Sequence, residues 1–160
     1  MVIIVMGVSG SGKTLIGKKL AEALSVPFHD ADDFHTPNNV EKMEHGIPLT
    51  DADRLPWLTL LADHITLWNE AGGIVLACSA LKESYRTLLS HHYRAKVQFV
   101  YLQGSKELIL SRMQARKHFF PPQLLDSQFA SLQVPERAIV VDINQPPDAM
   151  VREIVTALGE

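Results

Sequence analysis

The residues with the clearest capacity for chemistry form a glycine-rich segment near the start of the chain. It is a complete Walker A motif, made of Gly7, Val8, Ser9, Gly10, Ser11, Gly12, Lys13 and Thr14. Its glycines let backbone N–H groups turn inward around phosphate oxygens, and the following helix directs the positive end of its dipole to the same point. The Lys13 ammonium adds charge for the β- and γ-phosphates, and the Thr14 hydroxyl is a ligand for Mg²⁺. The segment predicts a nucleoside triphosphate site but leaves the fate of the γ-phosphate open.

Two carboxylates, Asp30 and Asp32, follow a second short apolar segment. Ligands bind beyond the carboxyl ends of strands in parallel sheets, so this is a favourable place for them. The strand expected at residues 74–78 ends without the acidic residue that most P-loop ATPases use for Mg²⁺, so another carboxylate must assist. One carboxylate can orient hydrated Mg²⁺ while the other accepts a proton from a substrate hydroxyl. An acidic turn that caps a helix is the alternative.

Several cationic side chains have spacings that suit the binding of anions. Arg54 follows two aspartates, Lys82 and Arg86 share one helical face, and Arg112 and Arg116 share another. Phosphoryl transfer requires cations around the equatorial oxygens and the leaving group. For any one of these arginines taken alone, a solvated surface position is the alternative.

Short β-branched apolar segments alternate with segments of helical periodicity. Strands are expected at residues 2–6, 26–29, 74–78, 97–102 and 138–142. Helices are expected at residues 13–24, from Asn38 as N-cap to about 46, and at about 54–71, 82–91, 105–115, 124–132 and 147–158. This order predicts a three-layer α/β/α sandwich with a parallel sheet. Taken with the phosphate loop, it resembles the P-loop NTPase, nucleoside-monophosphate-kinase-like class. The basic segment that begins at Arg116 suits a mobile lid over about residues 116–131.

Composition places the chain among ordinary globular proteins. Its 160 residues predict a single domain over 1–160, and its formal charge of −3 argues against a nucleic-acid partner. The one cysteine excludes an internal disulfide and a multi-cysteine zinc site. The apolar stretch near the start is too short to span a bilayer and lacks a signal-peptide pattern. We therefore expect a cytoplasmic protein with no membrane partner, and leave a homodimer open.

Further segments match a known family. The most distinctive are Pro48–Leu58 and Cys78–Lys82, joined by Asp30-Ala31-Asp32 with His35, Tyr85-Arg86, Arg116 with His118-Phe119, and Gln128-Phe129. On these residues the chain resembles the gluconokinase family of small P-loop kinases, related to shikimate kinase, from about residue 2 to residue 151. It departs from the family pattern where Thr36 precedes Pro37, and where the glycine that the family places before His118 is missing.

The resemblance implies that ATP and Mg²⁺ are used to phosphorylate D-gluconate at its 6-hydroxyl, giving 6-phospho-D-gluconate and ADP. It implies a metal site at Thr14 and Asp30, and a catalytic set of Lys13, Asp32 and the lid residue Arg116. It implies substrate contacts from Asp32, His35, Arg54, Lys82 and Arg86, with the arginines suited to a carboxylate. It also implies an adenine site between Arg112 and Gln145-Pro146.

Other functions stay open at this point. A sister P-loop kinase acting on shikimate or another sugar acid is one, a plain ATPase is another, and a non-catalytic ATP-binding regulator is a third. The intact Lys13, Thr14, Asp30, Asp32 and Arg116 argue against the regulator. A hydrogen bond within a loop explains His35 about as well as catalysis does. Structural packing is enough to explain Trp57, Cys78 and Gln128.

Overall fold

The computed structural model describes residues 1–90, 95–115 and 122–159. At its centre is a five-stranded sheet with the order β2-β3-β1-β4-β5. All neighbouring strands pair in parallel. The strands are β1 (Val2–Met6), β2 (Phe28–Asp30), β3 (Ile74–Ala77), β4 (Val97–Gln103) and β5 (Ile139–Asp142). The parallel sheet confirms the predicted fold class.

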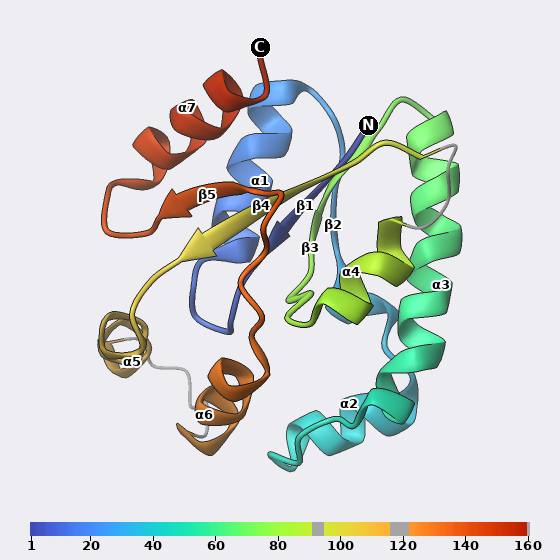
Figure 1. The fold of residues 1–160 in the computed structure, drawn as a ribbon, viewed down its shortest axis with the longest axis vertical. Coiled ribbons are helices and arrows are strands. Elements are labelled where there is room, and N and C mark those ends of the chain that lie inside the picture. The colour runs from blue at the N-terminus through green and yellow to red at the C-terminus, as the bar shows by residue number, and fades with distance from the viewer. Residues whose placement is uncertain (91–94, 116–121, 160) are drawn as a thin grey trace.

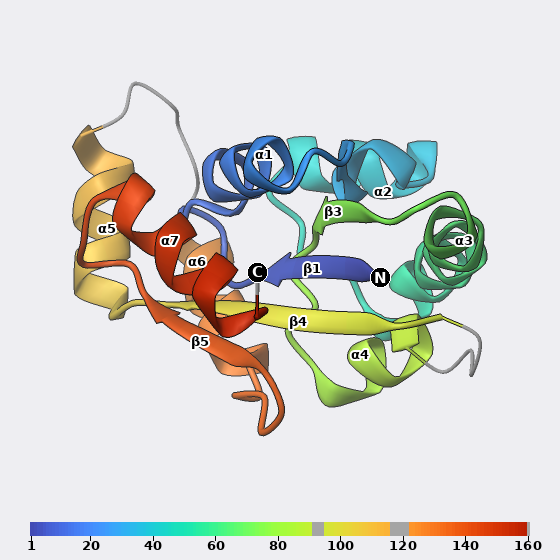
Figure 2. The same cartoon turned by 90° about the horizontal axis from the view of Figure 1, so that it is seen from above.

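Helices cover both faces of this sheet, with α1 and α7 on one face and α3 and α4 on the other (Figures 1 and 2). No helix in the described ranges is long and apolar enough to cross a bilayer. The helices are α1 (Lys13–Leu24), α2 (Pro37–Glu44), α3 (Asp51–Glu70), α4 (Glu83–Ser90), α5 (Lys106–Ala115), α6 (Pro122–Ser131) and α7 (Pro147–Ala157).

The alternation of side chains along β1 explains why the sheet needs helices on both faces. Ile3 and Val5 enter the core beneath α1 and α7, whereas Val2, Ile4 and Met6 enter the core beneath α3 and α4. Every residue of β1 is therefore buried, as the uninterrupted apolar sequence predicts for a central parallel strand. This rigid central strand leads directly into the phosphate loop.

Among the helix starts that differ from the prediction, two are explained by their caps. The N-cap of α2 is Thr36, whose hydroxyl accepts the backbone N–H of Asn39 at 3.2 Å, so the predicted cap at Asn38 is wrong. Pro37 occupies the first helical position, where its fixed φ and missing N–H are tolerated. Helix α3 begins at Asp51, earlier than expected, because Thr50 and Asp53 form a capping box.

The loops that follow β1, β2 and β3 meet at the carboxyl edge of the sheet. Helices α2, α5 and α6 lie beyond this edge (Figure 1). The chain runs from β1 to β2 and β3 on one side, and then crosses to β4 on the other. A reversal of this kind opens a crevice at the strand ends where ligands bind.

Candidate functional site

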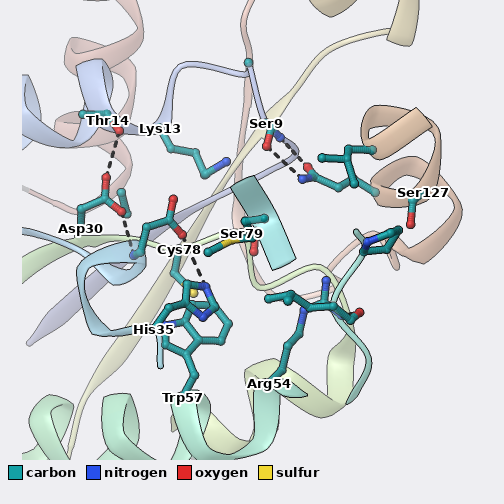
Figure 3. Close-up of a pocket in the computed structure, with 18 of the residues that line it drawn as sticks. Ser9, Lys13, Thr14, Asp30, His35, Arg54, Trp57, Cys78, Ser79 and Ser127 are labelled. Carbon is teal, nitrogen blue, oxygen red and sulfur yellow. Dashed lines mark hydrogen bonds and ion pairs between the residues drawn. The ribbon is translucent and has the colours of Figure 1, made fainter. Parts of the chain in front are cut away.

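A cavity of about 1000 Å³ opens at the carboxyl edge of the sheet. Its walls come from the phosphate loop, the end of β2, residues 43–49, the end of β3 and helix α6 (Figure 3). The predicted site residues among its lining are Ser9, Gly10, Gly12, Lys13, Thr14, Asp30, Asp32, His35 and Arg54. The fold thus brings the phosphate loop, the acidic pair and one arginine into a single space.

The phosphate loop curls around its own lysine. Gly10 and Gly12 have φ values of 82° and 101°, a region that residues with a Cβ rarely adopt. The Lys13 ammonium donates to the carbonyl oxygens of Gly7 and Val8, each at 3.0 Å. Burial lowers the pKa of Lys13, and the nearby Asp32 and Asp30 carboxylates oppose that change. The loop therefore holds a desolvated cation at its centre.

The Asp30 carboxylate has two roles in this geometry. Its Oδ1 accepts the backbone N–H of Asp32 at 3.0 Å and so caps the 3₁₀ turn Ala31–Phe34. Its Oδ2 accepts the Thr14 hydroxyl at 3.3 Å. The expected alternative, an acidic cap, is therefore present, yet the same carboxylate also faces the phosphate loop. Thr14 and Asp30 together present hard oxygen atoms to the cavity.

Asp32 lies one residue further along the same turn. Its side chain is 76% exposed, and it lines the cavity. Loss of part of its hydration at the cavity, followed by repulsion from Asp30, raises the pKa of Asp32, while the Lys13 ammonium opposes the rise. A carboxylate with a raised pKa is a better proton acceptor than an ordinary aspartate.

The His35 ring forms another part of the cavity wall. It stacks on Trp57, with ring centroids 4.0 Å apart and an interplanar angle of 16°. Its Nε2 lies 3.7 Å from Asp32 Oδ1. Burial and the neighbouring Arg54 lower the pKa of His35 to about 4, so the ring is neutral at physiological pH.

Arg54 reaches the cavity from the first turn of α3. Its Nη1 donates to the Leu49 carbonyl at 2.6 Å and to the Tyr85 hydroxyl at 3.2 Å. The Tyr85 hydroxyl in turn donates to Asp51, and the Lys82 ammonium lies 3.0 Å from the same carboxylate. Hydrogen bonds from Tyr85 and Lys82 lower the pKa of Asp51. This network fixes the direction of the Arg54 guanidinium. Tyr85 belongs to the family match, but the sequence assigned it no part in the site.

Lys82 and Arg86 do not line the cavity. Arg86 is only 7% exposed, and its guanidinium donates to the carbonyls of Ala80, Leu81 and Gln133 at 2.7, 3.1 and 2.8 Å. Ala80 has a φ of 45°, so Arg86 braces a strained turn directly after β3. The Arg86 guanidinium is therefore held by backbone carbonyls. The predicted contact between Arg86 and the substrate stays an untested prediction.

The residues predicted for the adenine site lie together but outside the cavity. Arg112 Nη2 donates to the Ile143 carbonyl at 2.7 Å, which joins α5 to the loop after β5. In that loop Gln145 donates to the Asp142 carbonyl and to Glu153, at 2.8 and 3.0 Å. Arg116 and residues 117–121 of the expected lid lie outside the described residues.

Gln128 is a second residue whose contacts the sequence did not reveal. Its Oε1 accepts the Ser9 backbone N–H at 2.6 Å, and its Nε2 donates to the Ser9 hydroxyl at 2.9 Å. One amide thereby joins α6 to the phosphate loop, and both residues line the cavity. Gln128 is part of the family match, but an amide that pairs with a distant loop cannot be distinguished from a packing residue in sequence alone.

Comparisons with known proteins agree with this geometry. The family model of shikimate kinase matches residues 9–157. A thermosensitive gluconokinase from Escherichia coli (strain K12) is 53% identical over 152 residues, which cover 88% of this chain and 78% of that protein. The chain belongs to the gluconokinase family. A probable gluconokinase from Dictyostelium discoideum is 44% identical over an alignment that covers 99% of this chain and 86% of that protein.

A solved structure extends the likeness to three dimensions. The crystal structure of a gluconokinase from Sinorhizobium meliloti 1021 has a TM-score of 0.91 and 42% identity, covering 99% of this chain and 91% of that one. The resemblance to this family that the motifs predicted is therefore confirmed, and this member of the gluconokinase family is a P-loop kinase that uses ATP.

Proposed function

We propose that the protein phosphorylates D-gluconate at its 6-hydroxyl, converting ATP to ADP and giving 6-phospho-D-gluconate. The observation that carries this proposal is the convergence of Lys13, Asp32 and Arg54 on one cavity. A phosphate loop, a proton acceptor and a guanidinium are the groups needed to join ATP to a hydroxy acid. The names of the related gluconokinases supply the identity of that acid.

The residues divide the reaction between them. The backbone N–H groups of the loop and the Lys13 ammonium bind the β- and γ-phosphates. Asp32 accepts the proton of the gluconate 6-hydroxyl while the hydroxyl oxygen forms a bond to the γ-phosphorus. The bond from that phosphorus to the ADP oxygen breaks. The Arg54 guanidinium pairs with the carboxylate at the other end of gluconate. Its network with Tyr85 and Leu49 holds it ready for that pairing.

The donor set at Thr14 and Asp30 fits Mg²⁺. Mg²⁺ prefers oxygen ligands, keeps several waters and takes few protein groups beside substrate phosphates. The Thr14 hydroxyl and the Asp30 carboxylate supply such oxygens beside the phosphate loop, 3.3 Å from each other. When bound there, the ion would neutralise charge on the β- and γ-phosphates.

The remaining parts of the site are proposed from the resemblance to the family. Arg112 and Gln145-Pro146 would flank the adenine, because the Arg112 hydrogen bond to Ile143 places α5 beside that loop. Arg116, within a lid over about residues 116–131, would supply a further cation to the phosphates. Reaction in the cytoplasm agrees with the use of ATP. A homodimer stays a prediction that sedimentation equilibrium can test.

A coupled assay of ADP release tests the proposed function. With ATP and Mg²⁺ present, we expect D-gluconate to raise ADP release well above the basal rate, and other aldonic acids and shikimate to do so less. Product analysis should show phosphate on the 6-oxygen. Greater stimulation by shikimate or another acid would reassign the substrate, and equal rates with and without every acid would leave only an ATPase or a regulator.

A further prediction concerns the support of Arg54. Replacing Tyr85 with phenylalanine removes the hydroxyl that joins Arg54 to Asp51 but keeps the ring. We expect the KM for gluconate to rise roughly tenfold, the value of one hydrogen bond to a charged group, while kcat and the KM for ATP change little. Tyr101→Phe, at a buried tyrosine outside the cavity, is the matched control. An unchanged KM for gluconate would show that Tyr85 does not position Arg54.

A further inference from the structure

The side-chain amide of Asn39 is fully buried beside the cavity, with an exposed fraction of 0%. Its Nδ2 lies 2.9 Å from the Asp53 carbonyl oxygen and 3.2 Å from Nδ1 of His35. A carbonyl oxygen can only accept a hydrogen bond, so the Asn39 atom that faces Asp53 must be its nitrogen. The Asp53 contact therefore fixes the orientation of the amide.

That orientation determines where His35 carries its proton. The same NH₂ group that donates to Asp53 turns its second hydrogen toward His35 Nδ1, so this ring nitrogen must present a lone pair. In a neutral imidazole the proton is then on Nε2. The buried amide thus uses both N–H groups as donors and leaves its oxygen without a hydrogen-bond partner among the described residues.

The protonated nitrogen points to the reacting groups. The His35 side chain is 3% exposed, and its ring is held flat against Trp57. Trp57 is itself held by the hydrogen bond from its Nε1 to the Ala31 carbonyl at 2.7 Å. With the ring fixed in this way, Nε2 lies 3.7 Å from Asp32 Oδ1, at the place where the acceptor hydroxyl must approach Asp32.

We propose that Asn39 is a positioning residue that holds His35 in its Nε2–H tautomer. His35 Nε2 thereby donates a hydrogen bond to the oxygen of the substrate hydroxyl that binds beside Asp32. The part that concerns the hydroxyl rests on the proposed function. An Nε2–H group has no lone pair with which to take the hydroxyl proton. His35 therefore orients the oxygen atoms of this subsite, and Asp32 remains the group that accepts the proton.

The tautomer can be measured without any substrate. In ¹⁵N-labelled protein near neutral pH, long-range ¹H–¹⁵N correlations distinguish a ring nitrogen that carries a proton from one that does not. We expect His35 Nδ1 to be unprotonated and Nε2 to be protonated. The opposite pattern, or rapid averaging between the two tautomers, would overturn the proposal even if the enzyme phosphorylates gluconate.

Substitution of Asn39 tests the cause. In Asn39→Asp the new carboxylate can only accept a hydrogen bond. We therefore expect the tautomer with a proton on His35 Nδ1 to become populated. Asn38→Asp, at the exposed neighbouring position, adds the same charge and should leave the His35 pattern unchanged. Asn39→Ala removes the donor without adding charge and should release the ring to tautomer averaging, which covers the case in which the aspartate variant does not fold. An unchanged Nε2–H pattern in Asn39→Ala would contradict the positioning role.

Kinetics then separate a donor from a base. Glutamine can present an N–H group near the position of His35 Nε2, so His35→Gln should retain most of kcat, while His35→Ala should lose more. Removal of a general base costs roughly 10²- to 10⁴-fold. A loss of that size in both variants, in an enzyme otherwise active on gluconate, would overturn the assignment of His35 as a donor.

Discussion

Replacing Lys13 with methionine will lower kcat for gluconate phosphorylation by roughly 10²- to 10³-fold, the usual cost of removing one preorganised electrostatic group. The ammonium lies at the floor of the cavity and donates to the Gly7 and Val8 carbonyls. Its charge is needed most when negative charge develops on the transferring phosphoryl group and on the ADP oxygen. Methionine keeps the length and the apolar stem of the side chain, so the loss will reflect charge rather than volume.

The chain offers a matched control on the same helix. Lys19 lies outside the cavity lining, and its Nζ is 3.1 Å from Asp148 Oδ1 in a pair at the surface. Exposed ion pairs contribute little to stability, so Lys19→Met should have wild-type kcat. Thermal unfolding of both variants will show whether they are folded. If Lys13→Met retains wild-type kcat while folded, the assigned role of the phosphate loop is wrong.

The start of the site was predictable because its signal is local. The glycine pattern and the helix that follows fix each other, and α1 spans Lys13–Leu24 as predicted. The start of α2 was not predicted, because Thr36 and Asn38 are both good N-cap residues. Pro37 decides between them, since proline is favoured at the first helical position. That signal is present in the sequence, but Glu41, three residues after Asn38, completes the spacing of a capping box and favours the later start.

The candidate site also contains residues that sequence can place and residues that it cannot. Asp30 and Asp32 reach the cavity because they follow the end of a parallel strand, a position that sequence can identify. The spacing of Lys82 and Arg86 predicts one shared helical face, but α4 begins at Glu83, so Lys82 precedes the helix and pairs with Asp51 instead. The Arg86 guanidinium is held by backbone carbonyls that no sequence pattern places beside it.

Contacts between side chains on distant elements were the least predictable. The Gln128 amide pairs with Ser9 across 119 residues of sequence. The Asn39 amide reaches the Asp53 carbonyl, 14 residues further along the chain, only because α2 packs beside the first turn of α3. Such pairs depend on the relative placement of helices to within a fraction of a hydrogen-bond length. Sequence can place residues near a site, but their partners follow from packing.

Replacing Asp32 with asparagine will reduce kcat for gluconate phosphorylation by roughly 10²- to 10⁴-fold, the range expected for the loss of a general base. Asparagine keeps the shape of the side chain and can still hydrogen-bond a hydroxyl, but its amide cannot accept the hydroxyl proton. Asp33→Asn is the matched control, because Asp33 is exposed, adjacent in sequence and absent from the cavity lining. It should retain wild-type kcat.

The pH dependence of the same variants provides a second, independent measurement. The acceptor must be ionised, so activity is lost as pH falls through the Asp32 pKa. Desolvation and repulsion from Asp30 raise that pKa above the usual 3.8, which shifts the acid limb of kcat/KM to higher pH than an unperturbed aspartate would give. Asp33→Asn should keep this limb, whereas the residual activity of Asp32→Asn should lose it.

A loose transition state leaves the hydroxyl proton in place until late in the transfer and demands little of a base. If Asp32→Asn raised the KM for gluconate but kept kcat and the acid limb, Asp32 would only bind the hydroxyl, and the proton would leave by another route.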